Sequence, residues 1–138
     1  MKIVLDTNCL LVSLPEKSVY HCLWNSFKQG KFKLCYSNEI LQEYEEILSR
    51  FYSPLAVLIT IEVLLKSPNV IQTIPYFKWK LITSDFDDNK FVDCALNARA
   101  DFIVTNDRHF NVLKDIDFPK INTIDIDAFK QFILKGKN

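Results

Sequence analysis

Two acidic residues of this sequence come directly after, or close behind, short apolar runs that are typical of buried strands. Asp6 follows the run at 3–5, and Asp107 follows the run at 102–104 by three residues. Unbroken apolar runs of this kind indicate strands covered on both faces, as in parallel sheets. Because parallel strands end at the same edge of a sheet, we expect the two carboxylates to meet there. Aspartate is also a common turn and cap residue, which accounts for either acid taken singly.

A third acid, Asp88, stands at the start of a predicted helix that runs to Arg99. The apolar positions of this helix recur at helical spacing from Phe91, and a rotation of roughly 100° per residue places Asp88 within their inward-facing arc. The alternative is that Asp88 only complements the positive end of the helix dipole. Asp93 lies about 140° from Asp88 on the same helical wheel and points elsewhere.

A fourth acid lies on the predicted helix from Ile40 to Phe51. Glu43 borders one edge of the apolar stripe of this helix, at about 40° from Ile47. Glu45 borders the other edge equally closely. Periodicity alone therefore leaves the choice between the two glutamates open.

Several carboxylates gathered in one place would require a counter-ion. Two unit charges 4 Å apart repel each other by ~4 kcal/mol at an effective dielectric constant near 20. A hard divalent cation removes this penalty, and Mg²⁺ and Mn²⁺ are the ions that suit all-carboxylate ligation. Such a site is suited to metal-assisted hydrolysis of phosphodiesters, which requires no histidine base.

The elements that must position these acids alternate along the chain. Weaker strand signals lie at 34–36 and 121–124, and helical spacing marks four further segments, at 19–27, 40–51, 54–66 and 127–134. Ser37 or Asn38 is a candidate cap for the second of these. Strands that alternate with helices predict a three-layer α/β/α sandwich with a mainly parallel sheet. The length of 138 residues is that of one domain, so we expect residues 1–138 to form it.

Composition excludes several other classes of protein. With 49% apolar residues and 17 basic against 17 acidic side chains, the chain is neither a disordered polar segment nor a strongly basic nucleic-acid coat. Two glycines are too few for a glycine-rich phosphate loop, and four cysteines without a C-x-x-C pair do not indicate zinc. No leader peptide or membrane span is predicted, so we expect a soluble protein of the reducing cytoplasm.

Four segments of the chain resemble, in order and spacing, the motifs of PIN-domain nucleases, which include the toxins of bacterial and archaeal toxin–antitoxin pairs. The resemblance extends from residue 1 to about residue 110. Its segments are Ile3-Val4-Leu5-Asp6-Thr7-Asn8, Ser37-Asn38-Glu39-Ile40-Leu41-Gln42-Glu43, Asp87-Asp88-Asn89-Lys90-Phe91 and Ala100-Asp101-Phe102-Ile103-Val104-Thr105-Asn106-Asp107.

The resemblance implies roles for particular residues. It favours Glu43 over Glu45. It also implies that Asn8 and Thr105 orient the acids through contacts with them, without binding the metal themselves. Asp93 stands where many members of the family carry a further acid, so it is a candidate additional ligand. The acids implied to bind the metal and to carry catalysis are Asp6, Glu43, Asp88 and Asp107.

The same resemblance implies a metal-dependent endoribonuclease that uses Mg²⁺ or Mn²⁺, acts on RNA and serves as the toxin of a pair with a cognate antitoxin. One alternative is a catalytically silent PIN-like domain that binds RNA or protein. Another is a small-molecule phosphohydrolase with an aspartate nucleophile. Such enzymes carry a second Asp where this chain has Asn8, which disfavours that interpretation.

Two segments offer candidate contacts to the substrate or to partners. Residues 76–80 alternate aromatic and basic side chains, so Lys78 and Trp79 are candidates for binding RNA; an amphipathic strand or loop with a buried apolar side is the simpler interpretation. Arg108 is a candidate phosphate contact, whereas we interpret His109 as a surface residue. Residues 55–65 are apolar nearly all round, which predicts a homodimer or antitoxin contact.

Overall fold

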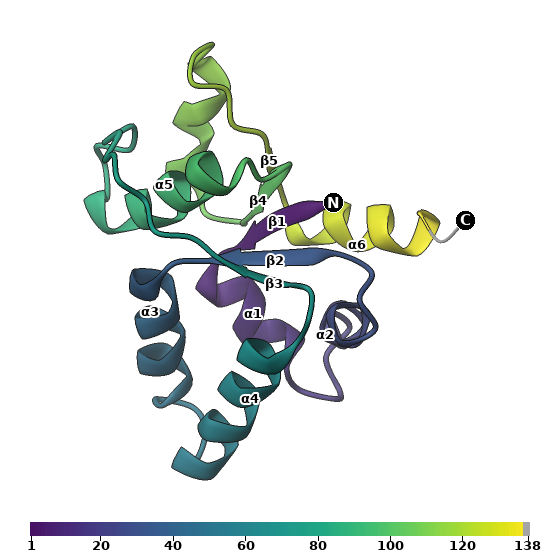
Figure 1. The fold of residues 1–138 in the computed structure, drawn as a ribbon. Helices are drawn as coiled ribbons and strands as arrows, with labels where there is room; N and C mark the ends of the chain where they lie inside the picture. The colour runs from purple at the N-terminus through teal and green to yellow at the C-terminus, as the bar shows by residue number, and fades with distance from the viewer. Residues whose placement is uncertain (137–138) are drawn as a thin grey trace.

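A five-stranded parallel sheet lies at the centre of the computed structural model, which describes residues 1–136 (Figure 1). The strand order is β3-β2-β1-β4-β5, and every neighbouring pair is parallel. The strands are β1 (Lys2–Leu5), β2 (Lys33–Tyr36), β3 (Val70–Gln72), β4 (Phe102–Val104) and β5 (Thr123–Ile124). The sheet thus confirms the predicted α/β arrangement, with no antiparallel strand among the described residues.

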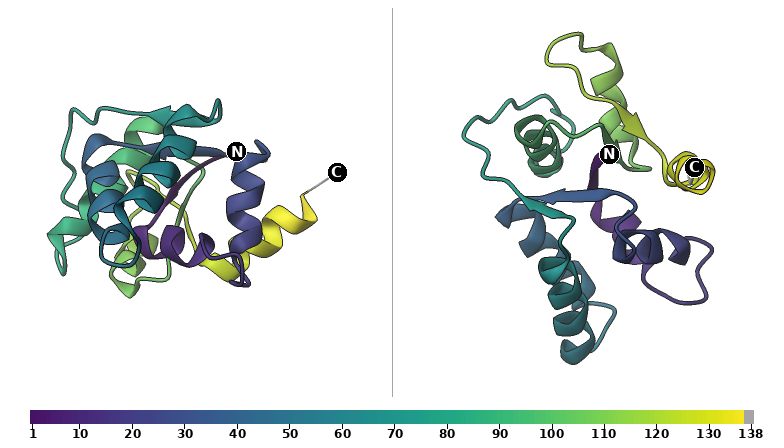
Figure 2. Two further views of the ribbon diagram at one scale, coloured as in Figure 1. Left: turned by 90° about the horizontal axis from the view of Figure 1, so that it is seen from below. Right: turned by 45° about the vertical axis from the view of Figure 1, so that its right-hand side comes forward.

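Helices cover both faces of this sheet, as the two views of Figure 2 show. One face carries α5 (Asn89–Ala98), together with the short 3-10 helices η1 (Phe86–Asp88) and η2 (Arg108–Asp115). The other face carries five helices, namely α1 (Thr7–Ser13), α2 (His21–Lys28), α3 (Asn38–Leu48), α4 (Pro54–Lys66) and α6 (Ile126–Lys135). None of the helices described between residues 1 and 136 is both long enough and apolar enough to span a bilayer.

Local signals in the sequence explain where the helices begin. Ser37 precedes α3, and its side chain accepts a hydrogen bond from the backbone N–H of Ile40, as the predicted cap requires. Ser53 caps α4 in the same way, and Pro54 occupies the first helical turn, where no backbone donor is needed. The Ser37 cap starts α3 directly after β2, and the Ser53 cap starts α4 after the short loop that follows α3.

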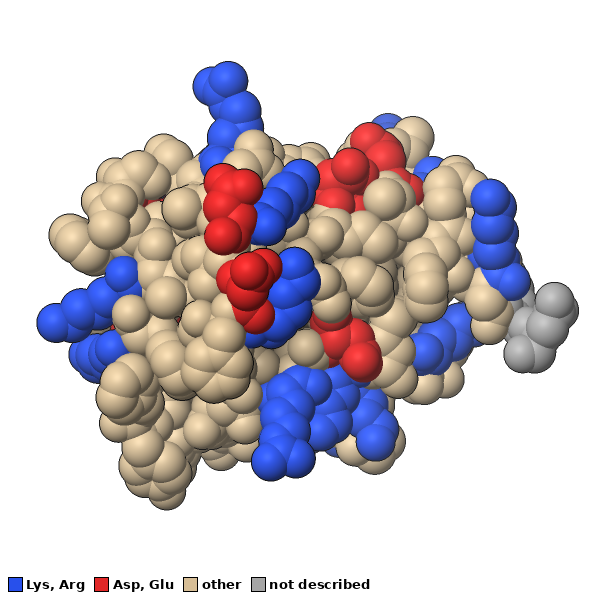
Figure 3. Space-filling view, turned by 90° about the horizontal axis from the view of Figure 1, so that it is seen from above, with Lys and Arg blue, Asp and Glu red and all other residues tan. Residues whose placement is uncertain are grey.

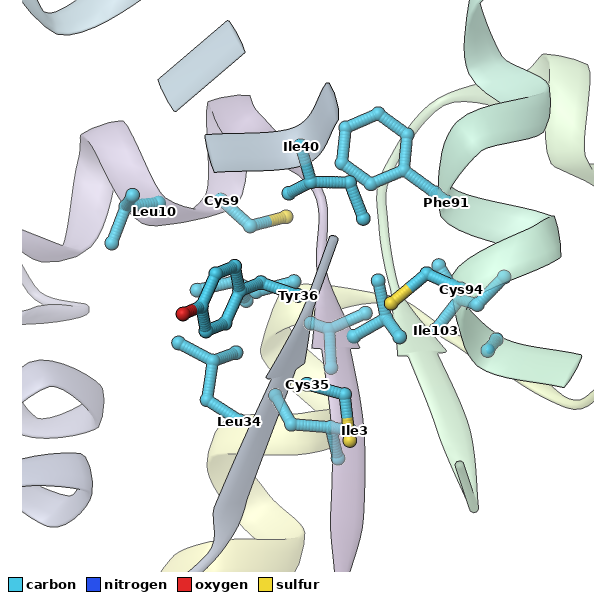
Figure 4. Close-up of a cluster of buried hydrophobic side chains, with 14 of the residues drawn as sticks. Ile3, Cys9, Leu10, Leu34, Cys35, Tyr36, Ile40, Phe91, Cys94 and Ile103 are labelled. Atoms are coloured by element: carbon cyan, nitrogen blue, oxygen red, sulfur yellow. The ribbon is translucent and has the colours of Figure 1, made fainter. Parts of the chain in front are cut away.

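The core is formed by side chains from the middle strands and from the helices on both faces (Figure 4). Ile3 and Ile103 are fully buried in the sheet, which agrees with the unbroken apolar runs seen in the sequence. Phe91 approaches them from α5, whereas Leu10 comes from α1 on the opposite face. The sheet therefore offers no free face, and ligands can approach it only at the ends of its strands.

The structure adds three elements that the sequence pattern did not predict, namely α1, β3 and the 3-10 helix η2. The helix α1 has seven residues and begins directly after Asp6, so only this one residue separates it from β1. A helix this short and this close to a strand has no periodic pattern of its own. The three residues of β3 are half-buried or exposed at the edge of the sheet and carry no strong pattern. The expected burial of the 76–80 segment is wrong for Tyr76 and Phe77, whose exposed fractions are 90% and 62%.

The chain reverses its direction of winding between β1 and β4. From β1 it continues through α1 to the strands on one side, whereas from β4 it continues through η2 to β5 on the other (Figure 1). In open α/β sheets, ligand sites lie beyond the carboxyl ends of the strands at such a reversal. Asp6 and Asp107 lie at this position.

Candidate metal centre

Asp6 is a buried carboxylate at the end of β1. Its side chain accepts a hydrogen bond of 2.7 Å from the hydroxyl of Thr105, and its backbone N–H donates to the carbonyl of Val104 at 3.0 Å. Burial raises the pKa of Asp6, and the negative charges of Asp107 and Glu43 raise it further, against the lowering effect of Thr105. Asp6 therefore has two acidic neighbours and no basic partner among the groups that shift its pKa.

Thr105 also holds the second strand-end acid. Its hydroxyl accepts a hydrogen bond of 3.0 Å from the backbone N–H of Asp107, so one side chain links both acids. The supporting role that the resemblance implied for Thr105 remains a prediction, and these two hydrogen bonds are the contacts through which it would act. Asn8 lies differently: it is exposed and lines a hollow of about 290 Å³ together with Asp6 and Asp107.

Asp88 is the third acid of this region and is the last residue of η1, on the face of the sheet that carries α5. Its side chain is 14% exposed, which agrees with the inward direction given by the helical wheel. Burial raises the pKa of Asp88 to about 6, and the charges of Asp85, Asp107 and Asp6 contribute in the same direction. His109 contacts both Asp88 and Asp107, and Thr105 links Asp107 to Asp6, so a chain of contacts connects the three acids.

His109 lies between the acids and was not expected there. Its Nδ1 atom is 3.3 Å from an oxygen of Asp88, 3.3 Å from an oxygen of Asp107 and 4.0 Å from an oxygen of Asp85. Potential ligand atoms of Asp85, Asp88 and His109 all lie within 4.8 Å of one another. His109 is thus exposed, as predicted for a surface residue, but it also contacts the acids, which was not predicted.

Glu43 is held by a cation and a hydroxyl. Its Oε1 lies 2.6 Å from the ammonium of Lys90, and its Oε2 accepts a hydrogen bond from the hydroxyl of Thr7. The Glu43 side chain is 18% exposed, whereas Glu45 is exposed, so the structure resolves the choice that periodicity left open.

Lys90 is the feature of this site that sequence reasoning missed. It is 11% exposed, and its ammonium also lies 3.1 Å from Asp87. Burial lowers the pKa of Lys90, but the hydrogen bonds and charges of Glu43 and Asp87 outweigh this and raise it. Lys90 thus supplies an internal positive charge at the Glu43 side of the centre.

Asp93 lies apart from these acids. It is 7% exposed, and its Oδ1 accepts a hydrogen bond of 3.1 Å from the backbone N–H of Trp79. Burial raises its pKa, and the charges that act on it are those of Glu39 and Lys78 rather than those of the four acids. The structure therefore places Asp93 beside the 76–80 segment. The helical wheel predicted its direction away from Asp88 but not this contact.

The remaining candidate contacts surround the centre. Lys78 is exposed and Trp79 is half-buried beside Asp93. Arg108 is exposed at the start of η2 and lines a second hollow, of about 570 Å³, to which Asp107 also contributes. On the face of the molecule drawn in Figure 3, Lys and Arg side chains lie among acidic ones, so no field of a single sign covers that face.

The donor set fits a hard divalent cation. Asp6 and Asp88 have raised pKa values because burial and neighbouring carboxylates disfavour their charged forms. A cation placed among them would reverse this effect, since it favours the ionised ligand. Carboxylate oxygens are the ligands preferred by Mg²⁺ and Mn²⁺, and the imidazole of His109 is a further donor that Mn²⁺ accepts more readily than Mg²⁺. Among the described residues, the ligand atoms that already lie close enough together are those of Asp85, Asp88 and His109, with Asp107 in contact with His109 and Asp6 linked to Asp107 through Thr105.

Comparison with known proteins agrees with this fold. The family model described as "PIN domain" matches residues 2–109, and no curated protein matches the sequence. Among solved structures, VapBC2 from Rickettsia felis, bound to a promoter DNA fragment, is 16% identical over 91% of this chain and 98% of that chain, with a TM-score of 0.62.

Two further solved structures are similar. The RRP44 PIN domain of T. brucei has a TM-score of 0.55 at 12% identity, covering 97% of this chain and 81% of that chain. The PIN domain endonuclease Utp24 has a TM-score of 0.51 at 17% identity, covering 90% of this chain and 84% of that chain. At these identities, the likenesses show a shared fold.

Proposed function

The chain belongs to the PIN-domain family, and we propose that it is a metal-dependent endoribonuclease that hydrolyses phosphodiester bonds of RNA. The observation that carries this proposal is the group of acids at the reversal between β1 and β4. Asp6 and Asp107 end these two strands, and Asp88 faces them from η1 with a pKa of about 6. Buried carboxylates that raise each other's pKa are costly to a fold unless a cation uses them.

Each residue has a separate role at such a site. Asp6, Asp88 and Asp107 supply negative charge to bind a cation, and Thr105 holds Asp6 and Asp107 in position through its hydroxyl. A bound Mg²⁺ or Mn²⁺ supplies Lewis acidity toward the phosphodiester and lowers the pKa of a water molecule. His109 contacts Asp88 and Asp107 and is exposed on its other side, so it can donate a hydrogen bond to a phosphate oxygen.

Cleavage of a fluorophore-labelled, unstructured RNA tests this function. We expect cleavage with Mg²⁺ or Mn²⁺, none with EDTA, and a loss of at least about 100-fold in Asp6→Asn or Asp107→Asn, because an enzyme whose residues act as a unit loses most of its rate with any one of them. Asp117→Asn, which changes an exposed acid elsewhere, is the matched control. Equal cleavage by Asp6→Asn and Asp107→Asn, purified in parallel, would refute the assignment and point to a contaminating nuclease.

One observation favours a second candidate, a silent PIN-like domain that binds RNA or protein. The ammonium of Lys90 neutralises Glu43 without any metal, so part of the acidic charge is already compensated within the chain. Under this alternative, Mn²⁺ would neither raise the Tm nor support cleavage, whereas RNA would still bind. The metal titration therefore separates the two functions.

We further propose that the protein acts in the cytoplasm as the toxin of a toxin–antitoxin pair and forms a homodimer. VapBC2, whose fold this chain shares, supports the pairing with an antitoxin. On α4, Leu55, Leu58 and Ile59 are more than half exposed, whereas the other side of the helix is buried. An apolar face of this kind marks a contact with another protein. Co-purification with the product of a neighbouring reading frame, lost in Leu58→Ser/Ile59→Ser, would support the pairing; a monomer with no such partner would refute it.

A further inference from the structure

A cavity of about 370 Å³ adjoins the metal centre, because Lys90, which binds Glu43, also forms part of its wall. Its other walls come from the segment that follows β3, from η1 and α5, and from the start of α3. In Figure 1 that segment leaves β3 and runs beside α5. None of the four acids assigned to the metal lines this cavity among the described residues. The volume falls within the range of sites that take small ligands.

Asp93 places a polar acceptor in the wall of this cavity. Its Oδ1 accepts a hydrogen bond from the backbone N–H of Trp79 and is thereby fixed. Among the described residues no buried side-chain oxygen lacks a partner, so the second oxygen of Asp93 is reached by solvent from the cavity and is free to accept a donor from a ligand there. The fixed Oδ1 also prevents the carboxylate from turning away from the cavity.

The rim of the cavity carries aromatic and basic side chains. Phe86 lines it and is 64% exposed, and Lys78 and Lys80 line it as exposed cations. Next to them, Phe77 packs edge-on against Trp79 with ring centroids 4.8 Å apart and remains largely exposed. Exposed aromatic rings beside lysines are the combination that stacks unpaired bases and contacts their phosphates.

Resting on the proposed ribonuclease function, we propose that this cavity receives one unpaired base of the RNA substrate and that Asp93 selects a base with an exocyclic amino group. Cytosine offers such a donor at the position where uracil offers a carbonyl oxygen, and an aspartate oxygen accepts from the former only. Phe86 provides a ring for stacking, and Lys78 and Lys80 contact the flanking phosphates. The cavity thus sets which base lies next to the cleaved bond.

Binding of oligo(C) and oligo(U), eight nucleotides long, tests the selection without cleavage. The chain has two tryptophans, so Trp24→Phe, which replaces the buried one on α2, leaves Trp79 as the fluorescent reporter. In EDTA we expect oligo(C) to bind at least about fivefold more tightly than oligo(U), which corresponds to one discriminating hydrogen bond. Equal affinities, or a preference for oligo(U), would overturn the proposal.

Asp93→Asn gives the sharpest comparison. The amide keeps an oxygen for the N–H of Trp79 but turns an NH₂ group toward the cavity, so we expect the preference to reverse toward oligo(U). The Tm and the circular dichroism spectrum of the variant check that it folds. An unchanged preference in a folded Asp93→Asn protein would refute the role of Asp93. Phe86→Ala, at an exposed position, provides a second variant and should weaken both oligonucleotides about tenfold.

The lysines are tested by the dependence of affinity on salt. Lys78→Ala/Lys80→Ala should reduce the slope of log affinity against log salt by roughly 1.4, since each phosphate contact to a single strand contributes about 0.7. Lys31→Ala/Lys33→Ala removes two exposed lysines at the opposite edge of the sheet, where β2 begins, and should leave the slope unchanged. Equal effects of the two pairs would show non-specific attraction and overturn the contact.

Failure of the base preference and failure of the nuclease function can be told apart. Cleavage in Mn²⁺ that is abolished by Asp6→Asn but shows equal rates at C and U would overturn the base selection and leave the nuclease intact. Selective binding of oligo(C) by a protein that cleaves nothing would keep the cavity assignment and reject the nuclease.

Discussion

Replacement of Asp88 by Asn should stabilise the metal-free protein and, at the same time, abolish its stabilisation by metal. The pKa of Asp88 is raised from 3.8 to about 6, chiefly by burial and then by the charges of Asp85 and Asp107. The native state therefore binds more protons than the unfolded state between about pH 4 and pH 6. Stability from this group is fully present below pH 4 and is lost as the pH rises through 6.

The size of the effect follows from this shift. Each pKa unit corresponds to 1.36 kcal/mol, so a shift of about two units gives an upper limit of about 3 kcal/mol at pH 8. Asp88 precedes α5 without making a side-chain capping bond, so its loss costs the dipole interaction of about 0.3–1 kcal/mol and the contact with His109, worth about 0.5–1.5 kcal/mol. A net gain of about 1–2 kcal/mol is expected, which for a chain of this length corresponds to a Tm increase of about 3–7 °C.

Thermal unfolding followed by circular dichroism measures both halves of this prediction. In EDTA, Asp88→Asn should exceed the wild type in Tm at pH 8 and match it at pH 4, while Asp117→Asn should match it at both. With Mn²⁺ at pH 8, the wild type should gain stability according to the ratio of free metal to Kd, and Asp88→Asn should gain little. A metal-free Asp88→Asn protein that is less stable than the wild type at pH 8 would refute the idea that these acids repel one another.

Three other predictions follow from the contacts around the acids. Lys90→Met should lower the free energy of unfolding, measured by urea titration in EDTA, by about 2–3 kcal/mol, because it leaves the largely buried Glu43 without a cationic partner. Lys66→Met, which breaks the exposed pair with Glu62, is the control and should lower it by less than about 0.5 kcal/mol. Thr105→Val should raise the pKa of Asp6 further and weaken Mn²⁺ binding about 10–100-fold by calorimetry, with Thr83→Val as the exposed control, and unaltered binding would contradict the supporting role. Lowering the pH from 7 to 5 should reduce the affinity for Mn²⁺ by about tenfold or more, since protons compete for Asp88 and Asp6, and an affinity independent of pH would contradict this.

The sequence was sufficient to predict most of the scaffold. Runs that are apolar throughout identified β1 and β4 because both faces of the sheet are covered, and the candidate cap Ser37 and the helical spacing from Pro54 marked the starts of α3 and α4 by short-range chemistry. The strand β3 escaped prediction because an edge strand of three half-exposed residues carries no periodic pattern. Its position depends on pairing with β2, which is a tertiary contact.

The parts of the site that escaped prediction depend on which side chains meet after folding. Lys90 lies two residues beyond Asp88 in the chain, but only the packing of α5 beside α3 brings it to Glu43. His109 carries no local pattern that separates a surface histidine from one facing Asp88, 21 residues away. The helical wheel did place Asp88 and Asp93 in different directions, because that relation is fixed within one short segment.

The hydrogen bonds that hold Asp6 explain why the acids at this site cannot move apart to relieve their mutual repulsion. Its backbone is tied to Val104 across the sheet, and its side chain is tied to Thr105, which also holds the backbone of Asp107. On the opposite face, the hydroxyl of the fully buried Tyr44 donates to the carbonyl of Leu5, directly before Asp6. Acids on a flexible loop would move apart and regain solvent, whereas these remain close together at the end of a rigid sheet. The fold therefore keeps the unfavourable charge in place until a cation binds, which makes the metal-free site costly and the metal-bound site preorganised.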